Sequence, residues 1–112
     1  MGISTHILNT STGRPAADVP VSLAHQEGTA WTTLQTARTD ADGRCKAMLP
    51  EGVPLGPGVF RLRFETALYF QAQGTPGLYP FVEIVFEIAD PSQHFHIPLL
   101  LTPNGYTTYR GS

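Results

Sequence analysis

The sequence has 112 residues and a mass of 12.2 kDa, which is room for one domain, so we expect residues 1–112 to fold as a single unit. Hydrophobic residues make up 41% and charged residues 14%, a balance that excludes a disordered charged tail because it is sufficient for a core. The net charge of −2 gives no electrostatic signature for nucleic acid, and no apolar run approaches the roughly 20 residues that cross a bilayer. We therefore expect neither nucleic acid nor membrane as a partner.

Glycine and proline divide the chain into short segments. The 11 glycines and 10 prolines separate runs of β-branched and aromatic residues, a pattern typical of a β-sandwich or barrel. In the first half of the chain, the predicted strands are residues 3–9, 19–25, 32–39 and 44–49. The turn Asp40-Ala41-Asp42-Gly43 joins the last two of them as a hairpin.

The second half contains the clearest alternation of apolar and charged residues, which indicates half-buried strands. The strands predicted here are residues 60–65, 82–88, 95–101 and 106–110. Between the first two we expect a helix over residues 66–73, capped by Thr66 and stopped by Gly74. The sequence thus predicts an all-β fold of eight strands with one short helix.

Polar side chains interrupt this apolar pattern at a few strand positions. His94 and His96 alternate with apolar neighbours, so both should point to the outer face of their strand. Pro98 in the same strand lacks a backbone N–H, and in an internal strand it should cause a local distortion that re-aims the neighbouring histidine. His6 lies in the first predicted strand, and Arg44 directly follows the hairpin turn.

Each of these residues also has a purely structural interpretation. A histidine on a strand is commonly a surface residue, and an arginine after a tight turn is commonly solvated. His94 and His96 could alternatively hold a metal ion, for which His6 would be the third ligand. No carboxylate or cysteine that would complete such a site is evident near these histidines in the sequence. Cys45 alternates with Arg44 and is expected in the core. As the sole cysteine it forms no internal disulfide, and we expect a reducing cytoplasm.

Other catalytic motifs do not occur in the sequence. It contains no glycine-rich phosphate loop, no Gly-x-Ser-x-Gly turn and no His-Glu-x-x-His pattern. Composition and spacing therefore lead to a β-sandwich with a polar patch on its outer face.

Four sequence blocks resemble the transthyretin-like 5-hydroxyisourate hydrolases, in the family's order and across nearly the whole chain. They are Ser4-Thr5-His6-Ile7-Leu8-Asn9 with Thr12-Gly13-Arg14-Pro15-Ala16, Thr39-Asp40-Ala41-Asp42-Gly43-Arg44, His94-Phe95-His96-Ile97-Pro98-Leu99-Leu100-Leu101, and Tyr106-Thr107-Thr108-Tyr109-Arg110-Gly111-Ser112. The ending Tyr-Arg-Gly-Ser is the most specific of these, because hormone-carrying transthyretin shares the fold and lacks this ending.

The resemblance implies a sandwich of two four-stranded sheets, assembled as a homotetramer that is a dimer of dimers. It implies hydrolysis of 5-hydroxyisourate, a small-molecule substrate, without metal or organic cofactor. The catalytic set carried over is His6, Arg44, His96 and Ser112, with His6, Arg44, Tyr109 and Arg110 contacting the substrate. Two rival interpretations are a transthyretin-type carrier with an apolar channel, and a purely structural β-sandwich whose polar residues would be scattered.

Overall fold

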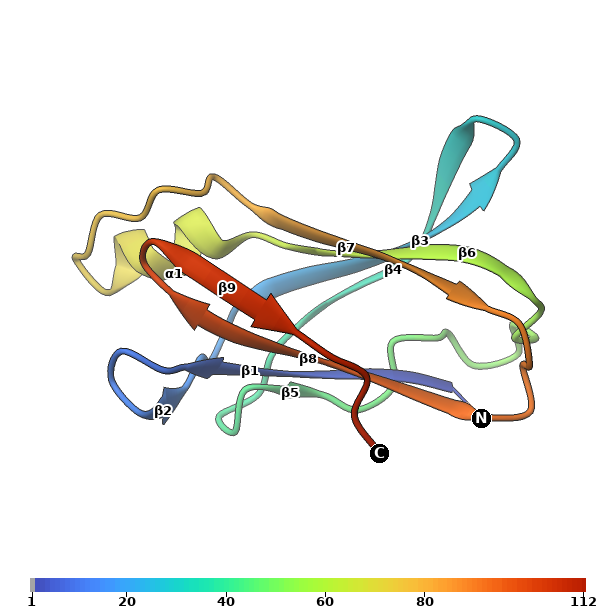
Figure 1. Cartoon of the computed structure of the whole chain (residues 1–112), viewed down its shortest axis with the longest axis horizontal. Helices are drawn as coiled ribbons and strands as arrows, with labels where there is room; N and C mark the ends of the chain where they lie inside the picture. The colour runs from blue at the N-terminus through green and yellow to red at the C-terminus, as the bar shows by residue number, and fades with distance from the viewer. Residues whose placement is uncertain (1) are drawn as a thin grey trace.

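Two β-sheets face each other as the layers of a sandwich in the computed structural model, which describes residues 2–112 (Figure 1). One sheet has the order β4-β3-β6-β7. Its strands are β3 (Pro20–Glu27), β4 (Ala30–Arg38), β6 (Gly58–Phe64) and β7 (Val82–Ile88). The other sheet has the order β2-β1-β8-β9, with β5 also paired to β1. Its strands are β1 (Gly2–Asn9), β2 (Arg14–Pro15), β5 (Arg44–Cys45), β8 (His94–Thr102) and β9 (Gly105–Thr108).

The core lies between the two sheets, where alternate residues of each strand meet. Phe60, Leu62 and Phe64 of β6 are buried, as their alternation with charged residues predicts. On β8 the same rule buries every second residue from Phe95 to Leu101. Each such side chain contributes about 1.5–3 kcal/mol relative to exposure, so this inner face of β8 fixes which of its residues must point outward.

The predicted all-β sandwich is confirmed, with two differences in strand number and length. Residues 2–112 contain nine strands, because Arg14 and Pro15, for which no strand was predicted, form the two-residue β2 against Leu8 and Asn9. The strand predicted over 44–49 is only β5, which pairs with β1 at two positions. The predicted hairpin between β4 and β5 is wrong, because β4 pairs with β3 in the other sheet and the turn at residues 40–43 leads from one sheet to the other. After Cys45 the regular hydrogen bonding to β1 stops. One backbone hydrogen bond remains there, from the N–H of Met48 to the carbonyl of Ile3.

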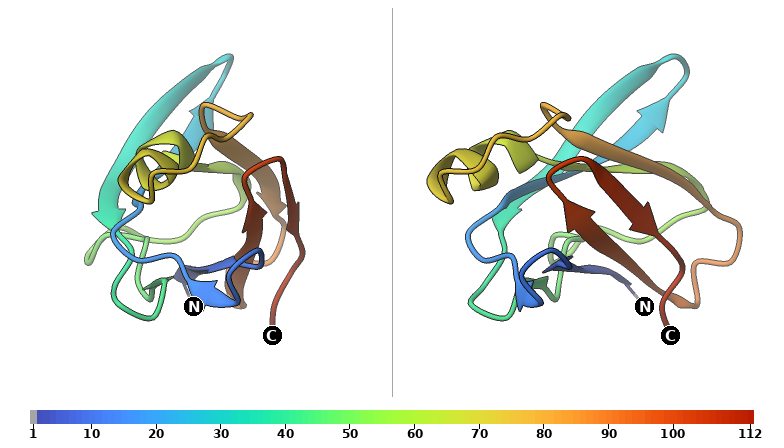
Figure 2. Two further views of the ribbon diagram at one scale, coloured as in Figure 1. Left: turned by 90° about the vertical axis from the view of Figure 1, so that its left-hand side faces the viewer. Right: turned by 60° about the vertical axis from the view of Figure 1, so that its left-hand side comes forward.

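Strand β8 lies inside its sheet, parallel to β1 and antiparallel to β9 (Figure 2). The expected distortion at Pro98 is wrong for the β1 side, where the register runs without a shift along both strands. The interruption falls instead on the β9 side, where the regular pairing ends at Leu99 and Thr108. There the Thr108 hydroxyl donates a hydrogen bond to the Pro98 carbonyl at 2.7 Å. The hydroxyl takes the place of the backbone N–H that would bond this carbonyl in a regular pairing.

A single short helix, α1 (Thr66–Ala72), closes one end of the sandwich (Figure 1). Thr66 is not its cap: Glu65 occupies the N-cap position without a side-chain bond, and Thr66 is the first helical residue. Gly74 ends the helix as predicted, with a positive φ of 66° and an N–H bond to the carbonyl of Gln71. Within residues 2–112 no helix has the length and hydropathy needed to cross a membrane.

Candidate active site

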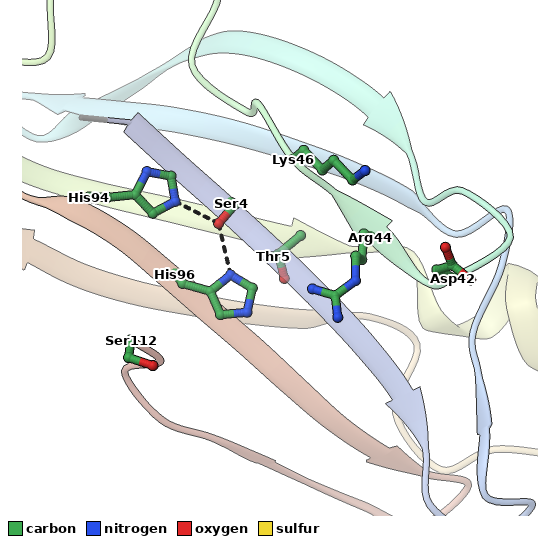
Figure 3. A pocket seen from close by; sticks show the side chains of 8 residues that line it. All are labelled: Ser4, Thr5, Asp42, Arg44, Lys46, His94, His96 and Ser112. Carbon is green, nitrogen blue, oxygen red and sulfur yellow. Dashed lines mark hydrogen bonds between the residues drawn. The ribbon is translucent and has the colours of Figure 1, made fainter.

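The polar residues of the outer face gather on three adjacent strands. β1 lies between β5 and β8, and its register places His6 opposite Arg44 and Ser4 opposite His96. His94 lies two residues before His96 on β8, so its side chain points to the same outer face of the sheet. Side chains that are up to 92 residues apart in sequence therefore meet on one surface (Figure 3).

A cavity of about 480 Å³ opens at this surface. The residues that line it all carry polar side chains: Ser4, Thr5, Asp42, Arg44, Lys46, His94, His96 and Ser112. The cavity thus combines two imidazoles, two permanent cations and hydroxyl groups in a space of small-molecule size.

Some of the predicted site residues line this cavity and others do not. Arg44, His96 and Ser112 line it together. His6 is half-buried beside Arg44 on the neighbouring strand but does not belong to the lining. Tyr109 and Arg110 also lie outside the lining, and their contact with a substrate stays a prediction.

Arg110 has a visible structural task. Its Nη2 donates to Gln93 Oε1 at 2.7 Å and to the His94 carbonyl at 3.4 Å, while its guanidinium lies 4.3 Å from the centre of the Phe95 ring. These contacts tie the C-terminal segment to β8. They bring Ser112 to the mouth of the cavity (Figure 3).

Ser4 and Lys46 line the cavity, but the sequence did not predict them as catalytic or substrate-contacting residues. It indicated His94 only as a ligand of an alternative metal site. Each of the first two lies two positions from a predicted site residue, Ser4 before His6 and Lys46 after Arg44. Because side chains alternate along an extended chain, this spacing was the available signal. For the metal alternative, residues 2–112 contain no group of three or more His, Cys, Asp or Glu side chains that could hold an ion.

The tight turn before β5 holds Arg44 in place. Asp40 Oδ1 accepts the backbone N–H groups of Asp42 at 2.9 Å and Arg44 at 3.0 Å, and the Arg44 bond is the largest cause that lowers the pKa of Asp40. Gly43 adopts a φ of 76° and packs against the Ile7 carbonyl so closely that a Cβ would overlap with it. Only glycine satisfies both conditions, so the Asp-Gly pair sets the direction in which β5 begins.

His96 is enclosed from two sides. Ser4 Oγ lies 2.8 Å from its Nδ1 on one side. On the other, Gly111 donates its N–H to the His96 carbonyl at 2.8 Å, and a Cβ on Gly111 would come within 2.5 Å of the ring's Cδ2. The glycine of the Tyr-Arg-Gly-Ser ending is therefore required by the imidazole that packs against it.

The pKa of His96 is lowered from its ordinary value. Burial is the largest cause because it disfavours the charged ring, and the positive charges of Arg44, His6 and His94 act in the same direction. The ring is consequently neutral at pH 7. A neutral imidazole can accept a proton, which is the property a general base needs.

Replacing Arg44 with methionine should raise the pKa of His96, because it removes one of the positive charges that oppose protonation. The pKa should remain below the ordinary histidine value, since burial is the larger cause and persists. An NMR titration of the His96 ring protons measures this shift. Arg14→Met, on the exposed strand β2, is the matched control and should leave the midpoint unchanged. A downward or absent shift in Arg44→Met would contradict the electrostatic assignment.

Comparison with known proteins agrees with this geometry. The 5-hydroxyisourate hydrolase of Salmonella typhimurium is 43% identical over 110 residues, which cover 98% of this chain and 80% of that protein. The solved 5-hydroxyisourate hydrolase of Klebsiella pneumoniae is 41% identical, with a TM-score of 0.87 and both chains covered completely. Sea bream transthyretin, solved with thyroxine, is 30% identical with a TM-score of 0.90, covering 99% of this chain and 95% of that one.

The sequence pattern of one family extends over almost the whole chain. The HIUase/transthyretin family matches residues 3–111, from the strand that carries Ser4 and His6 to the segment that packs Gly111 against His96. With relatives above 40% identity over nearly the full length, the assignment does not depend on the fold alone. The chain therefore belongs to the HIUase/transthyretin family.

Proposed function

We propose that this chain hydrolyses the cyclic amide of 5-hydroxyisourate to 2-oxo-4-hydroxy-4-carboxy-5-ureidoimidazoline, a step of urate breakdown. One observation carries the proposal: a neutral imidazole, a guanidinium and hydroxyl groups line a single small cavity. The chain is also 43% identical over 110 residues to the 5-hydroxyisourate hydrolase of Salmonella typhimurium. Fold similarity alone would not choose between the hydrolase and the carrier within the family.

Ring opening requires a base for water, stabilisation of the oxyanion and a proton for the leaving nitrogen. His96 takes the proton from water as the water oxygen attacks the amide carbonyl carbon. The carbon–nitrogen bond of the tetrahedral intermediate then breaks, and the nitrogen leaves with a proton returned from the imidazolium. A positioned general base of this kind supplies about 10²–10⁴-fold in rate.

Arg44 stabilises the negative charge that develops on the carbonyl oxygen. Its guanidinium stays protonated at any working pH, and its planar set of donors suits the oxygens of a urate-like ring. Removing such a donor costs about 3–4 kcal/mol of transition-state stabilisation. His6 lies beside Arg44 and completes the catalytic set with Ser112, and Tyr109 and Arg110 contribute to substrate binding from the segment that carries Ser112. Because side chains supply each of these roles, the proposed reaction uses neither a metal nor an organic cofactor.

We assign the active form to a homotetramer, a dimer of dimers, in the cytoplasm. β7 and β9 are edge strands of their sheets, and exposed apolar side chains lie on them at Val85 and Tyr106. Unpaired edges of this kind favour association with a second copy of the chain. The catalytic face is open in the single chain, so assembly would enclose the cavity. The free, buried Cys45 is compatible with a reducing compartment.

The second candidate function is a transthyretin-type carrier, because sea bream transthyretin, which was solved with thyroxine, has the same fold. A carrier site for an apolar aromatic ligand needs an apolar lining. The cavity described here presents Arg44, Lys46 and two histidines instead. This difference favours the hydrolase.

The decisive experiment follows the ultraviolet absorbance of freshly generated 5-hydroxyisourate with and without the purified chain. We expect the protein at catalytic concentration to accelerate its decay over many turnovers. A carrier would bind the compound stoichiometrically and leave its decay rate unchanged, and that result would refute the proposed function. Light scattering on the same preparation tests the tetramer independently.

A further inference from the structure

We propose that Ser4 is a positioning residue that fixes the tautomer of His96, with the ring proton on Nδ1 and the lone pair on Nε2. The inference deepens the proposed function, since it identifies which nitrogen of His96 accepts the proton from water. It also gives His94 a task, which is to hold the Ser4 hydroxyl in the orientation that this tautomer requires.

The contacts of Ser4 carry the argument. Its Oγ lies 2.8 Å from His96 Nδ1 and 2.8 Å from His94 Nε2, so one hydroxyl bridges both rings (Figure 3). Ser4 is only 8% exposed, so little water competes for these bonds. The regular β1–β8 register places Ser4 directly opposite His96. Nδ1 of His96 is therefore occupied, and Nε2 is the nitrogen left for substrate and water.

A hydroxyl group has a single hydrogen, so Ser4 cannot donate to both rings and at least one ring must donate its N–H to Ser4. Ser4 can donate to one imidazole nitrogen and accept an N–H from the other. If it donates to His94 Nε2, then His96 donates its Nδ1–H to Ser4 and keeps a bare Nε2. If it donates to His96 Nδ1, the proton of the neutral His96 ring is on Nε2, and the ring cannot serve as a base there.

The surrounding charges select the first arrangement. Figure 3 shows the second nitrogen of His96 on the side of the ring away from Ser4, towards the guanidinium of Arg44. An arginine offers only N–H donors, so a lone pair is favoured on the nitrogen that faces it and an N–H is disfavoured. Gly111 packs against the ring and limits its rotation about χ2, the flip that would place Cδ2 where Nδ1 meets Ser4.

The first test is the protonation pattern of the histidine rings. Nitrogen-15 NMR of the wild-type chain, at a pH where His96 is neutral, should show a protonated Nδ1 and a bare Nε2 for His96. In Ser4→Ala the Nδ1–H loses its acceptor while Arg44 remains, so the tautomer with the proton on Nε2 should gain population relative to the wild type. A wild-type His96 with its proton on Nε2 would overturn the inference. This measurement requires no turnover, so it stands or fails separately from the proposed activity.

The second test is kinetic and uses Ser4→Ala, Ser4→Thr and, as a matched control, Ser22→Ala on the outer face of the other sheet. Losing an orienting hydrogen bond to a group that becomes charged should lower kcat about 10- to 100-fold in Ser4→Ala, with KM nearly unchanged. Ser4→Thr retains the hydroxyl and should keep most of the activity, as should Ser22→Ala. Wild-type kcat in Ser4→Ala, or equal losses in Ser4→Ala and Ser4→Thr, would contradict the positioning role.

Discussion

Replacing His96 with asparagine should lower kcat for 5-hydroxyisourate at least about 100-fold, because it removes the base that activates water. Asparagine can still hydrogen-bond to Ser4, so the loss would report the missing basic nitrogen more than a rearranged site. The lowered pKa of His96 keeps its ring in the neutral, proton-accepting form down to lower pH. Steady-state kinetics on the purified variant give the comparison.

His25 provides the matched control for this experiment. It is the one histidine of the four that lies on the other sheet, where its ring stacks on Phe60 with centroids 4.8 Å apart. His25→Asn should therefore retain the wild-type rate. Circular dichroism and light scattering on both variants separate a catalytic defect from a folding defect. Near-normal turnover by a correctly assembled His96→Asn protein would remove His96 as the base.

Deleting residues 110–112 should abolish activity, with a loss of at least about 1000-fold, because it disturbs two parts of the proposed mechanism at once. The deletion removes Ser112 from the cavity and exposes the ring of His96 where Gly111 had packed. It also removes the Gly111 N–H bond to the His96 carbonyl and both bonds from Arg110 to the start of β8.

The fold should survive this deletion, since Arg110 and Ser112 are exposed and no core residue is removed. Far-UV circular dichroism and the thermal midpoint measure that, while the absorbance assay measures turnover. Ser112→Ala is the narrower control: it removes one hydroxyl and leaves the packing on His96, so its loss should be smaller. A truncated protein that keeps substantial activity would contradict a site built partly from this segment.

Much of the fold could be predicted because it depends on local alternation and on turn residues. The apolar faces of β6 and β8 follow from a two-residue period, and that period also placed His94 and His96 outside the core. The turn before β5 was predictable from Asp42 and Gly43, because Gly43 adopts a positive φ that few other residues tolerate. That this turn joins strands of different sheets was not predictable, since a tight turn of this composition normally closes a hairpin.

The remaining features depend on pairings between distant segments. Nothing local in Arg14–Pro15 indicates that it pairs with the end of β1, and nothing local ends β5 after two residues. The role of Pro98 depends on which neighbour lies on each side of β8. The contact of Ser4 with His96 depends on the parallel register of β1 and β8, which hydrophobic patterning alone does not specify.

The parallel pairing of β1 with β8 has a consequence for biogenesis. The bonds from Ser4 to the two histidines close loops of 90 and 92 residues, among the longest this chain could form. Contacts of such separation incur the largest entropic cost, so folding intermediates with well-formed hairpins would still be without the site. Enzymatic activity would then appear only in molecules in which β1 has paired with β8, and misfolded molecules would be inactive.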